Sequence, residues 1–236
     1  PSAVVVVATV RALKMHGGLA KNELGEENLT ALEKGVPNLM RHVSNIRNVY
    51  GLPCVVAVNR FPTDTDAEIA FIMEKCRTLG VNVVLSTVWA EGGKGGTALA
   101  EEVVRLCENE KGNFSFSYPL NMSLSEKMEA VVKRVYGGAS ISISAAAAKQ
   151  IRALTDMGFD SCPVCIAKTQ YSFSDNPALL GAPEGFTVNI KEVKISAGAG
   201  FAVVLTGDIL TMPGLPKRPA AEIIDVDDNG EISGLF

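Results

Sequence analysis

The sequence predicts an α/β protein of mostly parallel sheets flanked by helices, with a smaller mixed α+β domain at its C-terminal end. Residues 55–58 (VVAV) form a short, β-branched apolar run, typical of a strand buried on both faces of a parallel sheet. Patterns typical of helices alternate with such runs in the first half of the chain. Beyond about residue 140 the loops become rich in Gly, Pro, Ser and Asn, which indicates a second unit of mixed topology.

The composition is typical of a globular protein and gives no sign of a nucleic-acid-binding or membrane-spanning one. The chain has 236 residues, of which 47% are apolar and 20% are charged, as in ordinary globular proteins. A net charge of -4 gives no electrostatic reason to expect binding to nucleic acid or to an anionic membrane. No apolar run approaches the roughly 18 to 20 residues that span a bilayer, and nothing resembles a secretory signal. Five cysteines, mostly inside apolar segments, favour reduced thiols in a cytoplasmic protein.

The beginning of the chain is unusual. Pro1 and Ser2 lead directly into four valines, a buried-strand pattern with no methionine before it. A central strand at a terminus is an unusual start for a domain. We therefore interpret the chain as a fragment of a longer protein that supplies the neighbouring strands.

The first elements are a strand at residues 3–10 and helices between residues 26 and 49, where apolar residues keep helical spacing. Gly35 and Pro37 are expected to split the latter stretch into two helices. Between the strand and the first of these helices lie Arg11, Lys14, His16 and a glycine pair. They form either an anion-binding loop or a solvated turn. His42 is interpreted as a core or partly exposed histidine rather than a catalytic one.

Two aromatic residues follow strand ends in the central part of the chain. Phe61 comes just after strand 55–58, and Trp89, the only tryptophan, follows a strand at 81–87. Ligands of open α/β sheets bind beyond the carboxyl ends of strands, so the two rings could flank a flat ligand. The alternative is that Trp89 is a core residue. Thr65 and Glu68 have the spacing of a capping box that opens a helix at 66–79.

The glycine-rich stretch GGKGGT (residues 92–97) precedes a helix that reaches residue 108. It lacks the residue order of a P-loop, so we interpret it as a flexible loop that lets the backbone approach a ligand.

The remaining elements follow the same kinds of signal. Ser123 and Glu126 form a second capping box, opening a helix that ends near Tyr136. Strands are expected at 114–118, 140–143, 163–167, 186–195 and 201–206, and a helix at 145–157. The polar, aromatic loop 168–175 is either catalytic or a packed loop, and the sequence does not decide between the two.

Two motifs in the C-terminal third have simple explanations. Cys162 and Cys165 have the spacing of a metal or redox pair, but no second pair or nearby histidine completes a zinc site, so we interpret them as structural thiols. Residues 225–230 (DVDDNG) resemble the first half of a calcium loop, but the position of its glutamate falls on Phe236. A hairpin turn at Asn229 and Gly230 explains this stretch better.

Taken together, several stretches resemble the formate–tetrahydrofolate ligase family, and the resemblance extends across essentially the whole chain. They are VATVRALKMHGG (7–18), NRFPTDTDAE (59–68), WAEGGKGG (89–96), PVCIAKTQYSFSDNP (163–177), SAGAGF (196–201), TMPGLPKRPAA (211–221) and the terminal GLF (234–236).

The resemblance implies ATP-dependent joining of formate to tetrahydrofolate through formyl phosphate, giving 10-formyltetrahydrofolate. It implies ATP, Mg2+ and tetrahydrofolate as ligands of the parent enzyme, none of them bound covalently, a cytoplasmic location and a homotetramer. It also implies that the folate ring lies between Phe61 and Trp89, with Pro62 and Leu85 lining the pocket. No residue is assigned as catalytic, and no metal ligand is expected.

The family's P-loop would lie upstream of the first strand and is not in this sequence. Residues 1–41 are accordingly predicted to be the end of a nucleotide-binding domain, 42–140 the folate-binding domain and 141–236 the mixed C-terminal domain. Arg11, Lys14 and His16 either face the phosphate or nucleotide side of the cleft or hold the domain junction. Two functions remain open: the folate-binding half of the ligase, or a non-catalytic module for folate binding and oligomerisation.

Overall fold

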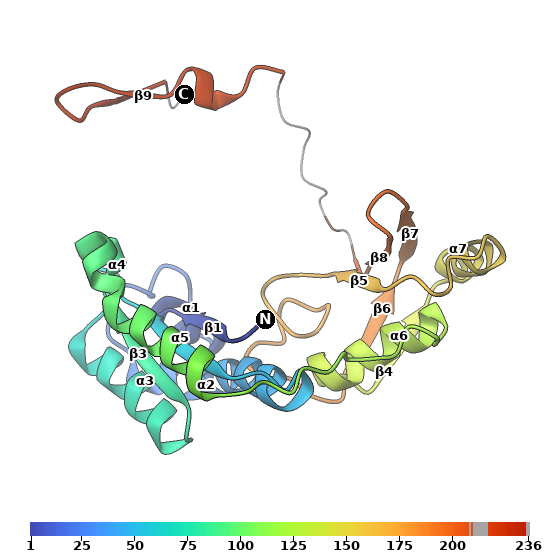
Figure 1. Cartoon of the computed structure of the whole chain (residues 1–236), viewed down its shortest axis with the longest axis horizontal. Coiled ribbons are helices and arrows are strands. Elements are labelled where there is room, and N and C mark those ends of the chain that lie inside the picture. The colour runs from blue at the N-terminus through green and yellow to red at the C-terminus, as the bar shows by residue number, and fades with distance from the viewer. Residues whose placement is uncertain (208, 210–216, 235–236) are drawn as a thin grey trace.

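A computed structural model describes residues 1–207, 209 and 217–234. Figure 1 shows two helix-and-sheet units side by side, followed by a small C-terminal hairpin. The α/β class is confirmed, because parallel sheets flanked by helices precede a sheet of mixed direction. Within the described ranges, no helix is long and apolar enough to cross a membrane.

The first unit is built on a parallel sheet of three strands, β1 (Val4–Ala8), β2 (Cys54–Asn59) and β3 (Asn82–Ser86). β2 lies in the centre and is buried along almost its whole length, as its continuous apolar run predicts. The carboxyl ends of β2 and β3 therefore lie together at one edge of the sheet, in the register Asn59 to Ser86.

The helices of this unit differ from the prediction at two points. β1 ends at Ala8 because the Thr9 side chain accepts a hydrogen bond from the Ala12 N–H and caps helix α1 (Val10–His16). Arg11, Lys14 and His16 therefore lie on a helix rather than in a loop.

The other helices of the first unit are α2 (Leu29–Ser44), α3 (Asp66–Thr78), α4 (Val88–Glu91), α5 (Thr97–Asn109), the π-helix η1 (Asn45–Val49) and the 3-10 helix η2 (Gly92–Gly96).

The predicted break at Gly35 and Pro37 is wrong, because α2 runs through both residues. A Cβ atom at Gly35 would lie 1.9 Å from the carbonyl oxygen of Leu13, so this glycine lets α1 and α2 pack backbone against backbone. Packing of α2 against α1 and the sheet thus keeps the helix continuous despite the proline.

The second unit contains α6 (Leu124–Val131), π-helix η3 (Val132–Tyr136), α7 (Ala145–Asp156) and two small sheets. One sheet pairs β4 (Ser140–Ile143) with β6 (Thr187–Ile190), and the other has the order β5 (Val164–Ala167), β8 (Phe201–Leu205), β7 (Glu192–Ser196). The single strand predicted at 186–195 is therefore two strands in different sheets. The strand predicted at 114–118 is wrong, because that stretch forms no regular strand.

Residues 217–234 form the short helix η4 (Ala220–Glu222) and a hairpin of β9 (Asp225–Val226) and β10 (Ile232–Ser233). The predicted turn is confirmed, since the Gly230 N–H donates to the Asp227 carbonyl at 3.0 Å. Residues 211–216 of the TMPGLPKRPAA motif and 235–236 of the terminal GLF lie outside the described residues, as does the calcium-loop position at Phe236.

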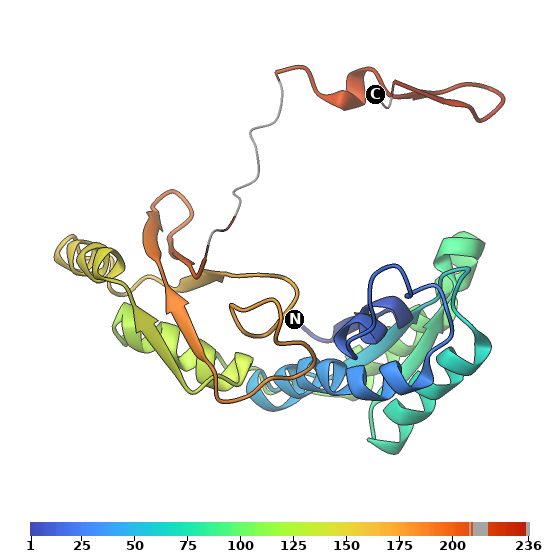
Figure 2. The same cartoon turned by 180° about the vertical axis from the view of Figure 1, so that it is seen from behind.

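Two clusters of buried side chains form the cores. One gathers residues between Ala8 and Val81, and the other gathers residues between Leu124 and Val204. Figure 2 shows α2 and η1 extending from the first unit toward the second. The three-part division at residues 41 and 140 stays a prediction.

Candidate functional site

Phe61 stands on a tight turn at the carboxyl end of β2. The Arg60 N–H still pairs with the Ser86 carbonyl at 3.0 Å, which extends the sheet to the last residue before the turn. The Asp64 N–H then donates to the Phe61 carbonyl at 3.0 Å, and the buried Asp64 carboxylate accepts from the Phe61 N–H at 2.8 Å. Pro62 occupies the turn position that proline favours. The turn that presents the Phe61 ring is therefore held by hydrogen bonds on both sides.

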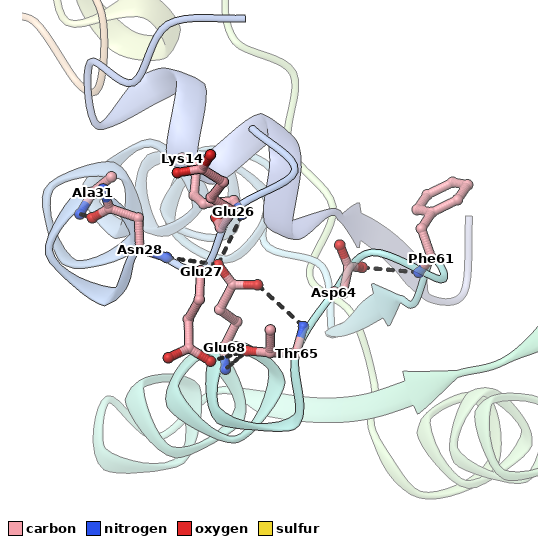
Figure 3. A network of polar contacts seen from close by, with 9 residues as sticks. All are labelled: Lys14, Glu26, Glu27, Asn28, Ala31, Phe61, Asp64, Thr65 and Glu68. Atoms are coloured by element: carbon pink, nitrogen blue, oxygen red, sulfur yellow. Dashed lines mark hydrogen bonds and ion pairs between the residues drawn. The ribbon is translucent and has the colours of Figure 1, made fainter. Parts of the chain in front are cut away.

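A buried polar network lies behind this turn (Figure 3). The predicted capping box is confirmed: Thr65 Oγ1 accepts from the Glu68 N–H, and the Glu68 carboxylate accepts from the Thr65 N–H. The other Glu68 oxygen pairs with Lys14 Nζ at 2.8 Å and accepts from the Asn28 N–H at 3.0 Å. Lys14 and Glu68 are both fully buried. The network thus joins α1, the start of α2 and the start of α3 next to the Phe61 turn, to which Thr65 connects it.

Hydrogen bonds explain why the buried Glu68 carboxyl stays charged. Burial alone would raise the pKa of the Glu68 carboxyl, but hydrogen bonds from Lys14, Asn28 and Thr65 outweigh it and hold the pKa below its ordinary value. Lys14 also donates to the Glu26 carbonyl at 2.7 Å. Lys14 is therefore buried and held by a carboxylate and a carbonyl of the protein, which favours a structural role over a role facing a phosphate.

Trp89 stands on the opposite wall, on the single-turn helix α4 that follows β3. Its side chain is 61% exposed, which excludes the alternative that it is a core residue. The next stretch, η2, packs closely on the end of β3: the Thr87 N–H donates to the Gly95 carbonyl at 3.1 Å. A Cβ atom at Gly95 would lie 2.5 Å from the Thr87 carbonyl carbon, so the position requires glycine. The glycine-rich stretch thus supports the Trp89 wall.

The two walls enclose a cavity of about 190 Å3, lined by Arg60, Phe61, Pro62, Thr87, Trp89 and Ala90. The ring centroids of Phe61 and Trp89 are 6.5 Å apart, and their planes are inclined by 53°. A flat ring between two parallel rings needs about 7 Å, twice the optimal carbon–carbon separation of roughly 3.5 Å. The rings are therefore close to the right spacing, but one must rotate before a flat ligand can stack on both.

The structure separates the other predicted site residues. Leu85 packs against the core of the first unit and is not among the described residues that line the cavity. Arg11 is exposed on the first turn of α1, Lys14 is buried in the network, and His16 lines a different cavity. Arg11, Lys14 and His16 therefore do not form one cationic loop.

Sequence reasoning missed Arg60, Thr87 and Ala90, although each neighbours a predicted residue or ends a predicted strand. Another feature not foreseen is Asn59, the last residue of β2. Its side-chain oxygen is the one buried side-chain polar atom, among those described, that has no hydrogen-bond partner. A buried acceptor without a donor is uncommon in native proteins, and Asn59 is not among the described residues that line the cavity.

In the part of the chain that the structure describes, no group of three or more His, Cys, Asp or Glu side chains could hold a metal ion. η2 is a 3-10 turn packed on Thr87 rather than a phosphate cradle. All five cysteines lie in described residues and are unpaired, including Cys162 and Cys165.

Comparison with protein families finds a match for this chain. The family model described as formate–tetrahydrofolate ligase matches residues 1–236, which is the whole sequence.

Proposed function

Because the chain belongs to the formate–tetrahydrofolate ligase family, we propose that the cavity between Phe61 and Trp89 binds the pterin ring of tetrahydrofolate. The observation that carries this proposal is the pair of rings at the ends of adjacent strands, 6.5 Å apart around an apolar cavity. Stacking on two aromatic faces suits a flat ligand, while a few polar groups set its orientation.

The cavity must widen to accept the ligand. Its volume of about 190 Å3 is below the roughly 300–1,000 Å3 of typical ligand clefts. We infer that Trp89, which is exposed and carried by one helical turn, rotates toward parallel while the hydrogen-bonded Phe61 turn stays in place. Leu85 would contribute through the packing of β3 rather than by direct contact.

Tetrahydrofolate binding followed by tryptophan fluorescence tests this proposal directly, because Trp89 is the only tryptophan in the chain. We expect saturable quenching, and we expect Phe61→Ala to weaken binding about tenfold or more, since one stacking face and its buried area are lost. Phe116→Ala is the matched control, because Phe116 is 76% exposed and lies outside the cavity. Absence of saturable quenching in a folded chain, or equal affinity in Phe61→Ala, would contradict the proposal.

We further propose that this chain supplies the folate-binding half of the ATP-dependent reaction and does not turn over alone. This proposal rests on the sequence, in which no stretch has the residue order of a P-loop. With formate, ATP, Mg2+ and tetrahydrofolate, the chain alone should bind folate without producing 10-formyltetrahydrofolate. Production by this chain alone would overturn this division of labour while leaving the folate pocket intact.

The alternative, a module that binds folate and assembles subunits without catalysis, makes a different prediction. Adding the N-terminal part of the family would restore formylation only if the first proposal holds. A protein of full family length that is folded, binds tetrahydrofolate and remains inactive would favour the alternative. The tetramer and the cytoplasmic location stay predictions from family resemblance.

A further inference from the structure

A second cavity lies where the end of α1, the second half of α2 and the loop after β5 meet. It has a volume of about 190 Å3, far above the roughly 10–15 Å3 that one water requires. Its lining includes His16, His42 and Lys168, which come from three separate segments. His16 and His42 are the only histidines in the chain. Two stretches whose roles the sequence left open, 11–18 and 168–175, therefore meet at one place.

His16 is held with one ring nitrogen turned to the protein. Its Nδ1 accepts a hydrogen bond from the Gly181 N–H at 3.3 Å. The Gly181 carbonyl in turn accepts from Asn38 Nδ2 at 2.8 Å, which fixes this loop against α2. Because Nδ1 is an acceptor, the neutral ring carries its proton on Nε2. The remaining polar group of this ring is therefore a donor.

Lys168 and His42 are positioned by the loop that follows β5. Lys168 Nζ donates to the carbonyls of Thr169, at 3.1 Å, and Ser172. It also lies 5.1 Å from the centre of the Tyr136 ring. An ammonium group has three donors, so one N–H is left after these two bonds. The His42 ring packs on Phe173, with 4.6 Å between ring centroids.

Basic groups gather here without an acidic partner in the lining. None of the described residues that line the cavity is Asp or Glu. The carboxylate that most affects Lys168, Asp175, is hydrogen-bonded to Asn189 and Ser174. Burial lowers the pKa of both histidines and of Lys168, and His16 and Lys168 lower the pKa of His42 further. A negative charge in the cavity would relieve both the burial penalty and this mutual repulsion.

We propose that this cavity binds an oxyanion of the phosphate class, with His16, His42 and Lys168 as its donors. Donors that converge from three segments suit a tetrahedral group with several oxygens better than a planar carboxylate, which is usually held from one side. This site is separate from the proposed folate pocket, because the two cavities share no lining residue. The proposal therefore stands or falls independently of folate binding.

The two histidines allow a direct test. We would titrate the 15N-labelled chain with inorganic phosphate, and separately with sulfate, at fixed pH, replacing sodium chloride to keep the ionic strength constant. Imidazole 15N resonances report only on His16 and His42. We expect the imidazole resonances of both histidines to shift as phosphate is added. Both shifts should saturate with the same dissociation constant. Glycerol 3-phosphate, titrated in the same way, shows whether the site also accepts a phosphate carried by a larger molecule; either source supports the proposal.

Substitutions separate a built site from general charge effects. Lys168→Gln should weaken phosphate binding at least about tenfold, because a hydrogen bond to a charged group is typically worth that much. Lys149→Gln removes the same charge from the exposed face of α7 and should leave the affinity unchanged. If Lys168→Gln does not fold, His42→Gln replaces it, with His16 as the reporter. Linear, unsaturable shifts, equal affinity in the cavity variant, or saturation by formate but not by phosphate or sulfate would overturn the proposal.

Discussion

The two walls of the proposed folate pocket are built in opposite ways. The Phe61 turn lies on a sheet end and is backed by a fully buried ion pair with a capping box (Figure 3). The Trp89 wall is a single helical turn followed by a glycine-rich 3-10 segment, and its ring is largely exposed. The comparison teaches that one wall can be preorganised while the other adjusts. Such a pocket loses little binding energy in ordering the fixed wall and still lets a flat ligand enter.

The largest expected effect comes from breaking the buried pair behind the Phe61 wall. Lys14→Met keeps the apolar stem but leaves the Glu68 carboxylate buried without its cation. We expect the free energy of unfolding, measured by urea denaturation, to fall by about 3–5 kcal/mol.

Two further variants test whether the cause is the unpaired charge. Lys14→Met with Glu68→Gln should recover part of the loss, because no charge is left unpaired and the amide oxygen can still accept the capping hydrogen bond from the Thr65 N–H. Lys75→Met breaks the partly exposed pair with Glu33 and should cost about 1 kcal/mol or less. Equal losses in Lys14→Met and Lys75→Met would mean that the network does not hold the turn.

The next largest effect is expected when the aromatic ring of the other wall, Trp89, is removed. Trp89→Ala should leave the free energy of unfolding within about 0.5 kcal/mol, because an exposed side chain on a surface turn contributes little to the core. It should weaken tetrahydrofolate binding, measured by calorimetry, by about tenfold, since a stacked ring is worth roughly 1–3 kcal/mol. A large loss of stability would instead show that Trp89 is structural.

Sequence reasoning was most accurate where the signal is local. Patterns that span only a few residues predict the buried strand β2, both capping boxes and the C-terminal turn. The structure confirms all of them. The two aromatic strand ends were also found, because parallel neighbours bring their carboxyl ends together.

The sequence did not reveal contacts between distant segments. The sequence places Lys14 beside Arg11 and His16 as a possible phosphate ligand, but its partner Glu68 lies on another helix. Pro37 predicts a break by its own chemistry, yet the close approach of α1 at Gly35 and burial of the helix face keep α2 continuous. Neither contact leaves a pattern in the neighbouring sequence, because both depend on how distant segments pack. The sequence alone therefore could not predict them.

A smaller effect is expected from the support of the Trp89 wall. Gly95→Ala would place a methyl group 2.5 Å from the Thr87 carbonyl carbon, so the backbone must shift. Overpacking of this kind costs about 1–3 kcal/mol. Gly93→Ala is the matched control, because a Cβ atom there meets no atom within 4 Å. We expect Gly95→Ala alone to lower the melting temperature and to weaken tetrahydrofolate binding, and indistinguishable variants would contradict the tight packing of η2.

The smallest expected effect is a pH dependence of the stability that Glu68 gives to the Phe61 wall. Because hydrogen bonds hold the pKa of folded Glu68 below its ordinary value of 4.5, the unfolded chain takes up this proton first as acid is added. The stability that Glu68 contributes is therefore complete above the unfolded pKa and is lost as the pH falls through the folded pKa. Urea denaturation of the wild type and of the Lys14→Met, Glu68→Gln double variant measures this loss, because the double variant lacks the titrating group. The stability difference between them should shrink from about pH 6 to about pH 3.5. A difference that stays constant with pH would mean that the charged pair adds nothing to the rigidity of the Phe61 wall.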